Sequence, residues 1–237
     1  MTEPLGLRLS AAITVAGVRP TNDSAASPEA QPEKLGLRER NKRDKLHRIR
    51  EAALHLFETK GFDATTTREI AERADVGIGT VFEYADDKRD LLFLVFNDDL
   101  DRLVDAAFAK VDGRKALSQQ VYAVFARFYE TFHPRATLAR LLLRELVFFS
   151  QGKQAGQFMA NRERILAGLE AIAAQARERG RLPAGEDPAE VAKVFFFLYS
   201  GEVRLWLSAP EPQLKAGLGS LQRTFALFGR GLGERVD

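Results

Sequence analysis

The stretch VGIGTVFEYADDKRDLL, which begins at Val76, concentrates residue types that could do chemistry. It holds two glycines, a threonine, two aromatic residues, an acidic pair and a lysine between two stretches of helical pattern. Gly77-x-Gly79 could begin a phosphate-binding loop, but a dinucleotide fingerprint also needs a third glycine, a preceding strand and an acidic residue about 20 positions later. The preceding residues, TTTREIAERAD, have helical spacing, so we reject the nucleotide-binding interpretation.

Other catalytic chemistries find little support in the composition. Cysteine is absent, which excludes disulfides, thiolate nucleophiles and zinc–thiolate sites. The three histidines, His47, His55 and His133, are too scattered for a metal cluster. No His–Asp–nucleophile set is present, so we predict no catalytic site, no metal site and no cofactor. An enzyme or carrier that uses the aromatic carboxyl-terminal half remains an alternative, because a cofactor could conceal such a site.

The charge is distributed unevenly along the chain. The net charge is only +2, since 35 basic residues nearly cancel 33 acidic ones. Between Lys34 and Arg50, however, eight lysines and arginines stand against two acids. Such a run is usually a solvated face, but beside a DNA-binding motif it can contact phosphates.

Composition also divides the chain. Residues 1–36 mix proline, alanine, serine, threonine and glutamate, which predicts a disordered leader. No apolar run approaches the roughly 18 residues needed to span a membrane, and residues 11–17 are too short for a signal peptide. We therefore expect a cytoplasmic protein without a membrane partner. From Asn41 onward the pattern is helical and no alternating strand occurs, which predicts an all-α fold.

Three helices are expected around the opening stretch. The first carries an apolar stripe at helical spacing and ends at Gly61. The second begins at Thr66, whose hydroxyl can cap free amides of the first turn. The Glu69 carboxylate can in turn accept a hydrogen bond from the backbone amide of Thr66. After a tight turn the third covers residues 78–84, and a longer helix begins at Lys88. Two short helices joined by such a turn form a helix-turn-helix, whose second member can enter the DNA major groove. A plain corner in a helical bundle is the alternative.

Residues 48–92 carry short patterns in a fixed order: AA-x-x-LF, Gly-Phe, Thr-Thr, IA-x-x-A-x-V, G-T-hydrophobic-aromatic-x-Tyr and K-x-x-L-L. In this order and at these spacings the patterns resemble the tetracycline-repressor (TetR) family of bacterial regulators. The resemblance implies a helix-turn-helix DNA-binding domain at 37–92 and a helical ligand-binding and dimerisation domain at 93–237. It covers about 45 residues, and the remainder agrees only in length and helical character.

The resemblance also assigns residues to double-stranded DNA. It places Thr67 and Arg68 against the backbone or a neighbouring base, and it gives Lys88 a phosphate. The recognition helix would present the following residues: Ile78, Gly79, Thr80, Phe82, Glu83 and Tyr84. These roles agree with general chemistry, since hydroxyls and lysines position a protein on DNA while groove-facing side chains discriminate bases.

Three residues depart from the family pattern. Phe82 replaces a usual tyrosine and loses a phosphate hydrogen bond, although it could contact a thymine methyl group. Ala85 replaces a core phenylalanine, which should loosen packing unless a neighbour fills the space. Gly77 replaces a serine cap at a cost of a few tenths of a kcal/mol. Glu83 has two open interpretations: it accepts from cytosine N4, or it faces solvent or pairs with Arg89.

The carboxyl-terminal half is expected to hold six helices, at about 88–111, 117–132, 134–150, 154–180, 188–208 and 211–229. Most of its aromatic residues should form core. The resemblance implies a pocket for a small-molecule effector, and Arg144, Glu145 and Phe148 are the candidates to contact it.

The last two helices would form a four-helix homodimer interface under the same resemblance. The candidate interface residues lie on one face of each helix: Phe195, Tyr199, Trp206, Leu214, Leu218, Leu221 and Phe225. Dimerisation would set two recognition helices about 34 Å apart, which predicts a near-palindromic operator. The sequence thus favours a ligand-responsive homodimeric repressor; an activator of the same family is the alternative.

Overall fold

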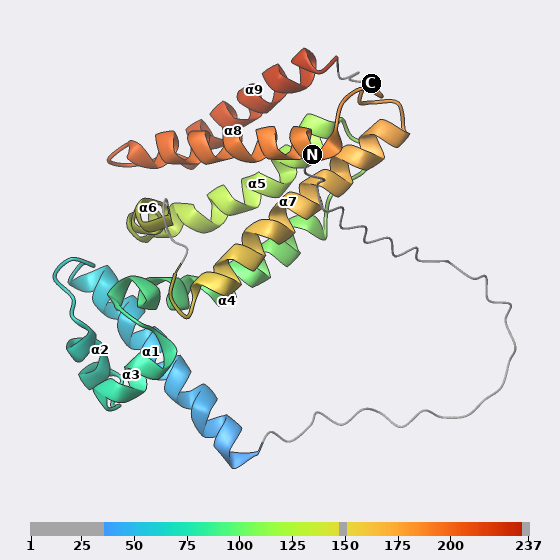
Figure 1. Ribbon diagram of the computed structural model, residues 1–237. Helices are drawn as coiled ribbons and strands as arrows, with labels where there is room; N and C mark the ends of the chain where they lie inside the picture. Colours follow the sequence, from blue (N-terminus) through green and yellow to red (C-terminus); the bar gives the residue numbers. More distant parts are fainter. Residues whose placement is uncertain (1–35, 147–150, 234–237) are drawn as a thin grey trace, which may run out of the picture. The chain divides into compact units, whose positions relative to one another are not determined.

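The structure is a computed structural model that describes residues 36–146 and 151–233 (Figure 1). Within those ranges the chain is helical and contains no strand, which confirms the all-α prediction. The leader expected at residues 1–36 lies, apart from Gly36, outside the described residues. The helices are α1 (Leu37–Thr59), α2 (Thr67–Arg73), α3 (Ile78–Tyr84), α4 (Lys88–Phe108), α5 (Leu117–Phe132), the 3-10 turn η1 (His133–Arg135), α6 (Ala136–Glu145), α7 (Ala155–Glu178), α8 (Pro188–Ser208) and α9 (Leu214–Gly231).

The first three helices pack against one another through buried apolar residues. α1 buries Ile49 and Phe57, and these side chains meet Ile70 of α2 and Val81 of α3 in one hydrophobic cluster. Ala85, which ends α3, is also buried in that cluster despite its small size. α1 contacts α2 and α4, and α2 contacts α3, so the first long helix supports the two short ones.

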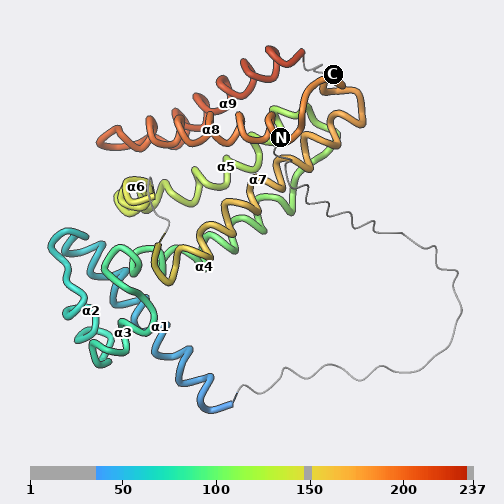
Figure 2. Tube along the Cα trace, viewed as in Figure 1, coloured from blue at the N-terminus to red at the C-terminus, as the bar shows by residue number. Residues whose placement is uncertain are grey.

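The remaining helices form a bundle built around α5. α7 lies along α4 and α8, while α9 lies along α5 and α8 (Figures 1 and 2). α4 runs without interruption from Lys88 to Phe108, so the domain boundary expected after residue 92 falls inside one helix. No helix among the described residues is both long enough and apolar enough to cross a bilayer.

Two helix boundaries differ from the sequence-based expectation. The single helix expected over 134–150 is a 3-10 turn followed by α6, which ends at Glu145. The last helix begins at Leu214 and not near 211, because Pro212 disfavours the helical conformation of the residue before it. The other predicted ends agree within a few residues, which is the usual spread of helix assignments.

The bundle core is rich in aromatic pairs. The Tyr199 ring of α8 stacks on Phe125 of α5 with centroids 3.9 Å apart, and Trp206 stacks on Tyr129 at 4.5 Å. Phe195 and Phe225 meet edge to face at 5.1 Å, which ties α8 to α9. Burial raises the pKa of Tyr199 above its ordinary value.

Most of the residues expected at a dimer interface belong to this core. Five of the seven residues assigned to the interface are buried within the single chain: Phe195, Tyr199, Trp206, Leu221 and Phe225. Leu214 and Leu218 are partly buried against the same core. Their stripe at helical spacing was correctly recognised as apolar, but it packs α8 and α9 onto α5 and leaves other side chains outside.

Candidate nucleic-acid interface and cavity

The amino end of α2 is fixed by a capping box. The Thr66 hydroxyl accepts from the amide of Glu69 at 3.2 Å, and the Glu69 carboxylate accepts from the amide of Thr66 at 2.9 Å. Lys60 at the end of α1 donates a further hydrogen bond to Glu69. The Lys60 contact, followed by the Thr66 amide, lowers the pKa of Glu69 to about 2. The T-x-x-E spacing therefore predicted this contact correctly.

The turn between α2 and α3 holds an unusual backbone conformation. Asp75 has φ 51°, in the left-handed region that aspartate tolerates better than most residues. Arg48 of α1 donates to its carbonyl at 3.1 Å and to its carboxylate at 3.3 Å, while Val76 donates to the carbonyl of Ala71 at 3.1 Å. Because the turn is bonded to α1 and to α2, it sets the direction in which α3 leaves α2.

α3 turns one apolar residue inward and several side chains outward. Val81 is fully buried, whereas Ile78 and Phe82 are 41% and 43% exposed. A methyl group added to Gly77 or Gly79 would meet no atom within 4 Å, so neither glycine is required by internal packing. α3 therefore presents a bare outer surface at its amino end, flanked by two apolar side chains.

Other residues assigned to DNA lie around this surface. Arg68 of α2 and Glu83 of α3 are exposed, while Thr67 and Thr80 are partly exposed. The Tyr84 hydroxyl donates to the carbonyl of Lys42 at 3.2 Å, which links α3 to the basic start of α1. Their contact with DNA stays a prediction.

Lys88 lies at the first turn of α4 and already has protein partners. Its Nζ donates to the carbonyl of Asp63 at 3.0 Å and lies 4.7 Å from the centroid of the Phe62 ring. An ammonium group has three donors, so this contact leaves hydrogen-bonding capacity for a phosphate. The expected phosphate role of Lys88 remains a prediction.

The carboxyl end of α3 is bonded to the segment 151–154 that precedes α7. Lys153 donates through Nζ to the carbonyl of Phe82 at 2.6 Å and to the carboxylate of Asp86. The Gln154 side chain donates to the carbonyl of Tyr84 at 2.9 Å. The last carbonyls of the recognition helix thus receive donors from a segment about 70 positions away.

Asp90 of α4 organises this junction. Its buried carboxylate accepts from three backbone amides: Asp86 at 2.9 Å, Lys153 at 3.0 Å and Gln154 at 2.9 Å. Gly152 has φ 108°, and a methyl group there would lie 2.7 Å from the Asp90 carboxylate. Sequence reasoning missed these residues, because their spacing in the chain gives no sign that they meet.

A cavity of about 350 Å³ lies between helices of the bundle. Its inner wall includes buried apolar residues such as Phe128, Leu142 and Val203 from α5, α6 and α8. Its polar lining includes Asn161 of α7, which is buried, and the exposed arginines Arg162 and Arg204. The volume falls within the range of about 300–1,000 Å³ that small-molecule sites occupy.

The residues expected to contact a ligand lie apart from this cavity. Arg144 pairs with Glu145 at 2.9 Å and with Asp63 at 3.4 Å, and Arg89 of α4 also pairs with Glu145 at 3.4 Å. This ion-pair group joins α6 to α4 and to the loop after α1, and neither Arg144 nor Glu145 lines the cavity. Phe148 lies outside the described residues. Ligand contact by these residues stays a prediction.

Comparisons with known proteins match this geometry. Residues 49–95 match the family described as bacterial regulatory proteins, tetR family. The regulator HbdR of Aromatoleum sp. (strain CIB) is 34% identical over 70 residues, which cover 30% of this chain but only 31% of that relative. The repressor KstR of Mycolicibacterium smegmatis is 25% identical over 171 residues, or 70% of this chain and 78% of KstR.

A solved structure shares the fold of most of this chain. FadR of Thermus thermophilus, a TetR-family repressor solved with lauroyl-CoA, has a TM-score of 0.59 and 23% identity, covering 76% of this chain and 93% of FadR. At that identity the likeness shows the fold alone. The family match runs from α1 into α4, so this part of the chain is that of a TetR-family bacterial regulatory protein.

Proposed function

We propose that this protein is a homodimeric repressor that binds a near-palindromic operator through α3 and releases it when a small molecule fills the cavity. The observation that carries the proposal is the outer surface of α3: two exposed apolar side chains beside two glycines that internal packing does not require. Glycines at such a surface let the backbone approach base-pair edges closely. The capping box and the Asp75 turn keep that surface in a fixed direction.

Each exposed residue suits a particular part of the duplex. Ile78 and Phe82 can contact thymine methyl groups in the major groove, and Glu83 can accept from the amino group of cytosine. Arg68 and Lys88 would contact phosphates, joined by the basic amino-terminal part of α1. Phosphate contacts supply affinity and register, whereas the α3 side chains supply discrimination between bases.

A second copy of the chain would cover the exposed apolar face of α8 and α9. Phe197, Leu205 and Leu227 are 61%, 69% and 65% exposed, and exposed apolar surface grouped on neighbouring helices often marks a protein–protein contact. They lie on the faces opposite the buried stripe, so they replace that stripe as the proposed dimer contacts. A pair of such faces would form a four-helix interface and set two copies of α3 about one DNA turn apart.

The cavity is the proposed effector site. FadR of T. thermophilus is a repressor solved with lauroyl-CoA, whose apolar chain and anionic head suit a cavity with an apolar wall and exposed arginines. Residues on both sides of the 151–154 segment, Leu146 and Phe158, line the cavity. Occupancy would therefore move that segment, which is bonded to the end of α3.

Gel-shift titration against DNA flanking the coding region tests the proposal. Wild-type protein should bind one site selectively at moderate salt. Lys88→Ala should weaken binding to all DNA and lower the salt slope by about one, whereas Glu83→Ala should change the preference at one base position. Lys110→Ala, at an exposed lysine beyond the end of α4, is the matched control. Absence of selective binding by the wild type, or identical effects of the Lys88 and Glu83 variants, would contradict the assigned roles.

A further inference from the structure

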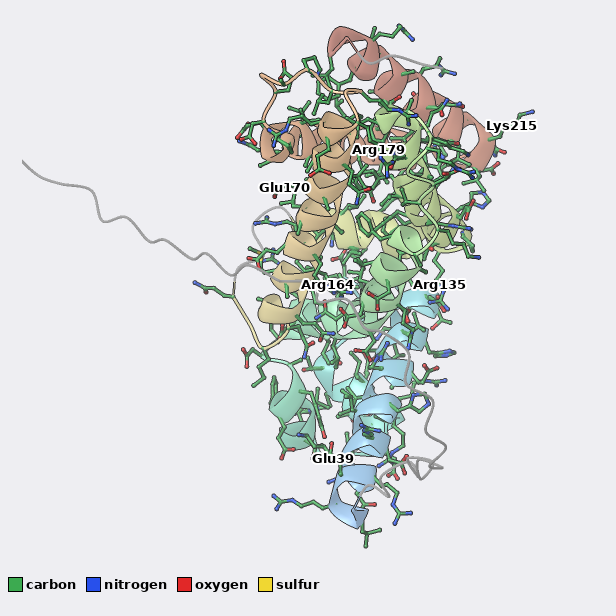
Figure 3. All side chains as sticks on the ribbon, turned by 90° about the vertical axis from the view of Figure 1, so that its right-hand side faces the viewer. Glu39, Arg135, Arg164, Glu170, Arg179 and Lys215 are labelled. Atoms are coloured by element: carbon green, nitrogen blue, oxygen red, sulfur yellow. The ribbon has the colours of Figure 1, made fainter. Side chains whose placement is uncertain are left out.

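Asn161 is a buried polar residue in the wall of the cavity, with only 2% of its surface exposed. Its Oδ1 accepts from the Arg164 guanidinium at 3.0 Å. Arg164, labelled on α7 in Figure 3, is itself held by Asp101 at 3.0 Å and by Asp105, both on α4. This network fixes the side-chain amide, because the opposite orientation would point its NH₂ group at a guanidinium.

The other end of the same amide has no partner. Nδ2 of Asn161 is buried and makes no hydrogen bond among the described residues. A buried donor without an acceptor destabilises a native structure, so such groups are rare unless a ligand or water completes them. In a cavity whose neighbouring walls are largely apolar, an unpartnered N–H group favours a ligand that carries an acceptor at this depth.

The positive charges of the cavity lie elsewhere on its lining. Arg162 and Arg204 are exposed, in contrast to Asn161, and therefore lie at the mouth. A ligand carboxylate placed next to Asn161 would lose its hydrating water molecules and gain only one hydrogen bond from a neutral donor. Burying a charge in this way costs free energy. A neutral carbonyl oxygen there, with the negative charge outside at the arginines, avoids that cost. The cavity lining therefore favours a ligand whose neutral acceptor atom lies inside, at Asn161, and whose negative charge lies at the mouth, at Arg162 and Arg204.

We propose that Asn161 donates a hydrogen bond to the carbonyl oxygen of an acyl thioester, whose alkyl chain fills the apolar cavity and whose anionic part contacts Arg162 and Arg204. This inference rests on the proposed function, because it takes the cavity as the effector site. It names Asn161 as the residue that distinguishes an acyl compound from an alkyl compound of equal length.

Calorimetric titration with two probes tests the assignment. Dodecanoyl-CoA carries the carbonyl, and S-dodecyl-CoA replaces it by a methylene group while keeping the chain and the charges. The wild type should bind dodecanoyl-CoA about tenfold more tightly, the usual effect of one hydrogen bond in a dry site. Asn161→Leu should abolish that preference by weakening only the thioester. Gln175→Leu, on the same helix but away from this cavity, should keep it.

Three results would overturn the assignment: equal affinity of the wild type for both probes, no binding of either probe, or equal loss of both in Asn161→Leu. Ligand-free Asn161→Leu should melt close to the wild type, because it removes a donor that lacks an acceptor and Arg164 keeps its ion pairs with Asp101 and Asp105 when the Asn161 oxygen is lost. A lower melting temperature together with equal loss of both probes would assign Asn161 a structural role. Operator binding is measured separately in gel shifts, so a failure of the repressor proposal would be seen there and not in the probe preference.

Discussion

Glu69 shows how one side chain ties two helices together. It completes the capping box of α2 and also accepts from Lys60 at the end of α1. Both contacts are stronger when the carboxylate is charged, and they lower its pKa from 4.5 to about 2. The folded pKa is lower than the unfolded pKa, so this contribution to stability is complete above about pH 4.5 and is lost as pH falls toward 2.

Glu69→Gln should therefore destabilise the protein at neutral pH and have progressively less effect in acid. Thermal unfolding of both proteins followed by circular dichroism between pH 7 and pH 2.5 measures the difference. The melting temperature of the wild type should exceed that of the variant at pH 7, and the gap should shrink progressively as pH falls below about 4.5. A gap at pH 2.5 as large as the gap at pH 7 would show that the contacts do not depend on the charge. Glu72→Gln, at an exposed acid on the same helix, should show no such change with pH.

What could be predicted at the residue scale depended on separation along the chain. The Thr66–Glu69 contact spans three positions and follows from one helical turn, so the sequence sufficed. The contacts of Asp90 with residues 153 and 154 span more than 60 positions. No periodicity in a single sequence predicts a contact between residues so far apart, so it was found only in the structure.

At the scale of elements, the junction between α4 and the 151–154 segment rests on Asp90. A carboxylate can accept at both oxygens, and here they serve three backbone amides. Asp90→Asn keeps the shape but offers only one acceptor oxygen, so at least one of the three amides loses its partner. We expect the free energy of unfolding to fall by about 1–3 kcal/mol.

Chemical denaturation of Asp90→Asn measures that loss. Asp105→Asn, at an exposed position of the same helix, should change the free energy by about 0.5 kcal/mol or less, because its ion pair with Arg164 is open to solvent. If the two variants behaved alike, the junction would not contribute to stability as its geometry indicates.

The elements themselves were largely predictable, and their partners were not. Periodicity and proline and glycine positions gave the long helices, including α5 and α8 with their observed limits. The same periodicity could not say whether the apolar stripe of α8 and α9 meets another helix of the chain or a second chain. Phe195 and Phe225 are buried, so this stripe packs within the chain's own core. The sequence could not show this, because both faces of α8 are apolar and either could have packed inward.

At the scale of the molecule, the proposed dimer depends on the outer face of α8 and α9. Leu205→Glu combined with Leu227→Glu would place charges opposite one another across that face, and burying unpaired charge is costly. The double variant should be a monomer in light scattering after size exclusion, keep its helical circular dichroism and lose most of its operator affinity. Leu37→Glu, at an equally exposed leucine of α1, should leave the mass unchanged. A dimer in the double variant would place the interface elsewhere.

The route by which Asp90 meets residues 153 and 154 also limits how this protein can be re-engineered. Consider a hybrid in which the amino-terminal helices of another protein are joined to this bundle at one point within α4. Such a hybrid would keep residues 151–154 of the junction but not the native segment around Asp90. The residue of the other protein at the position of Asp90 would then have to fit residues 151–154 of this chain. A side chain at Gly152 would clash with a carboxylate at that position. A functional transplant therefore requires two exchanged pieces, the first four helices and the short loop before α7.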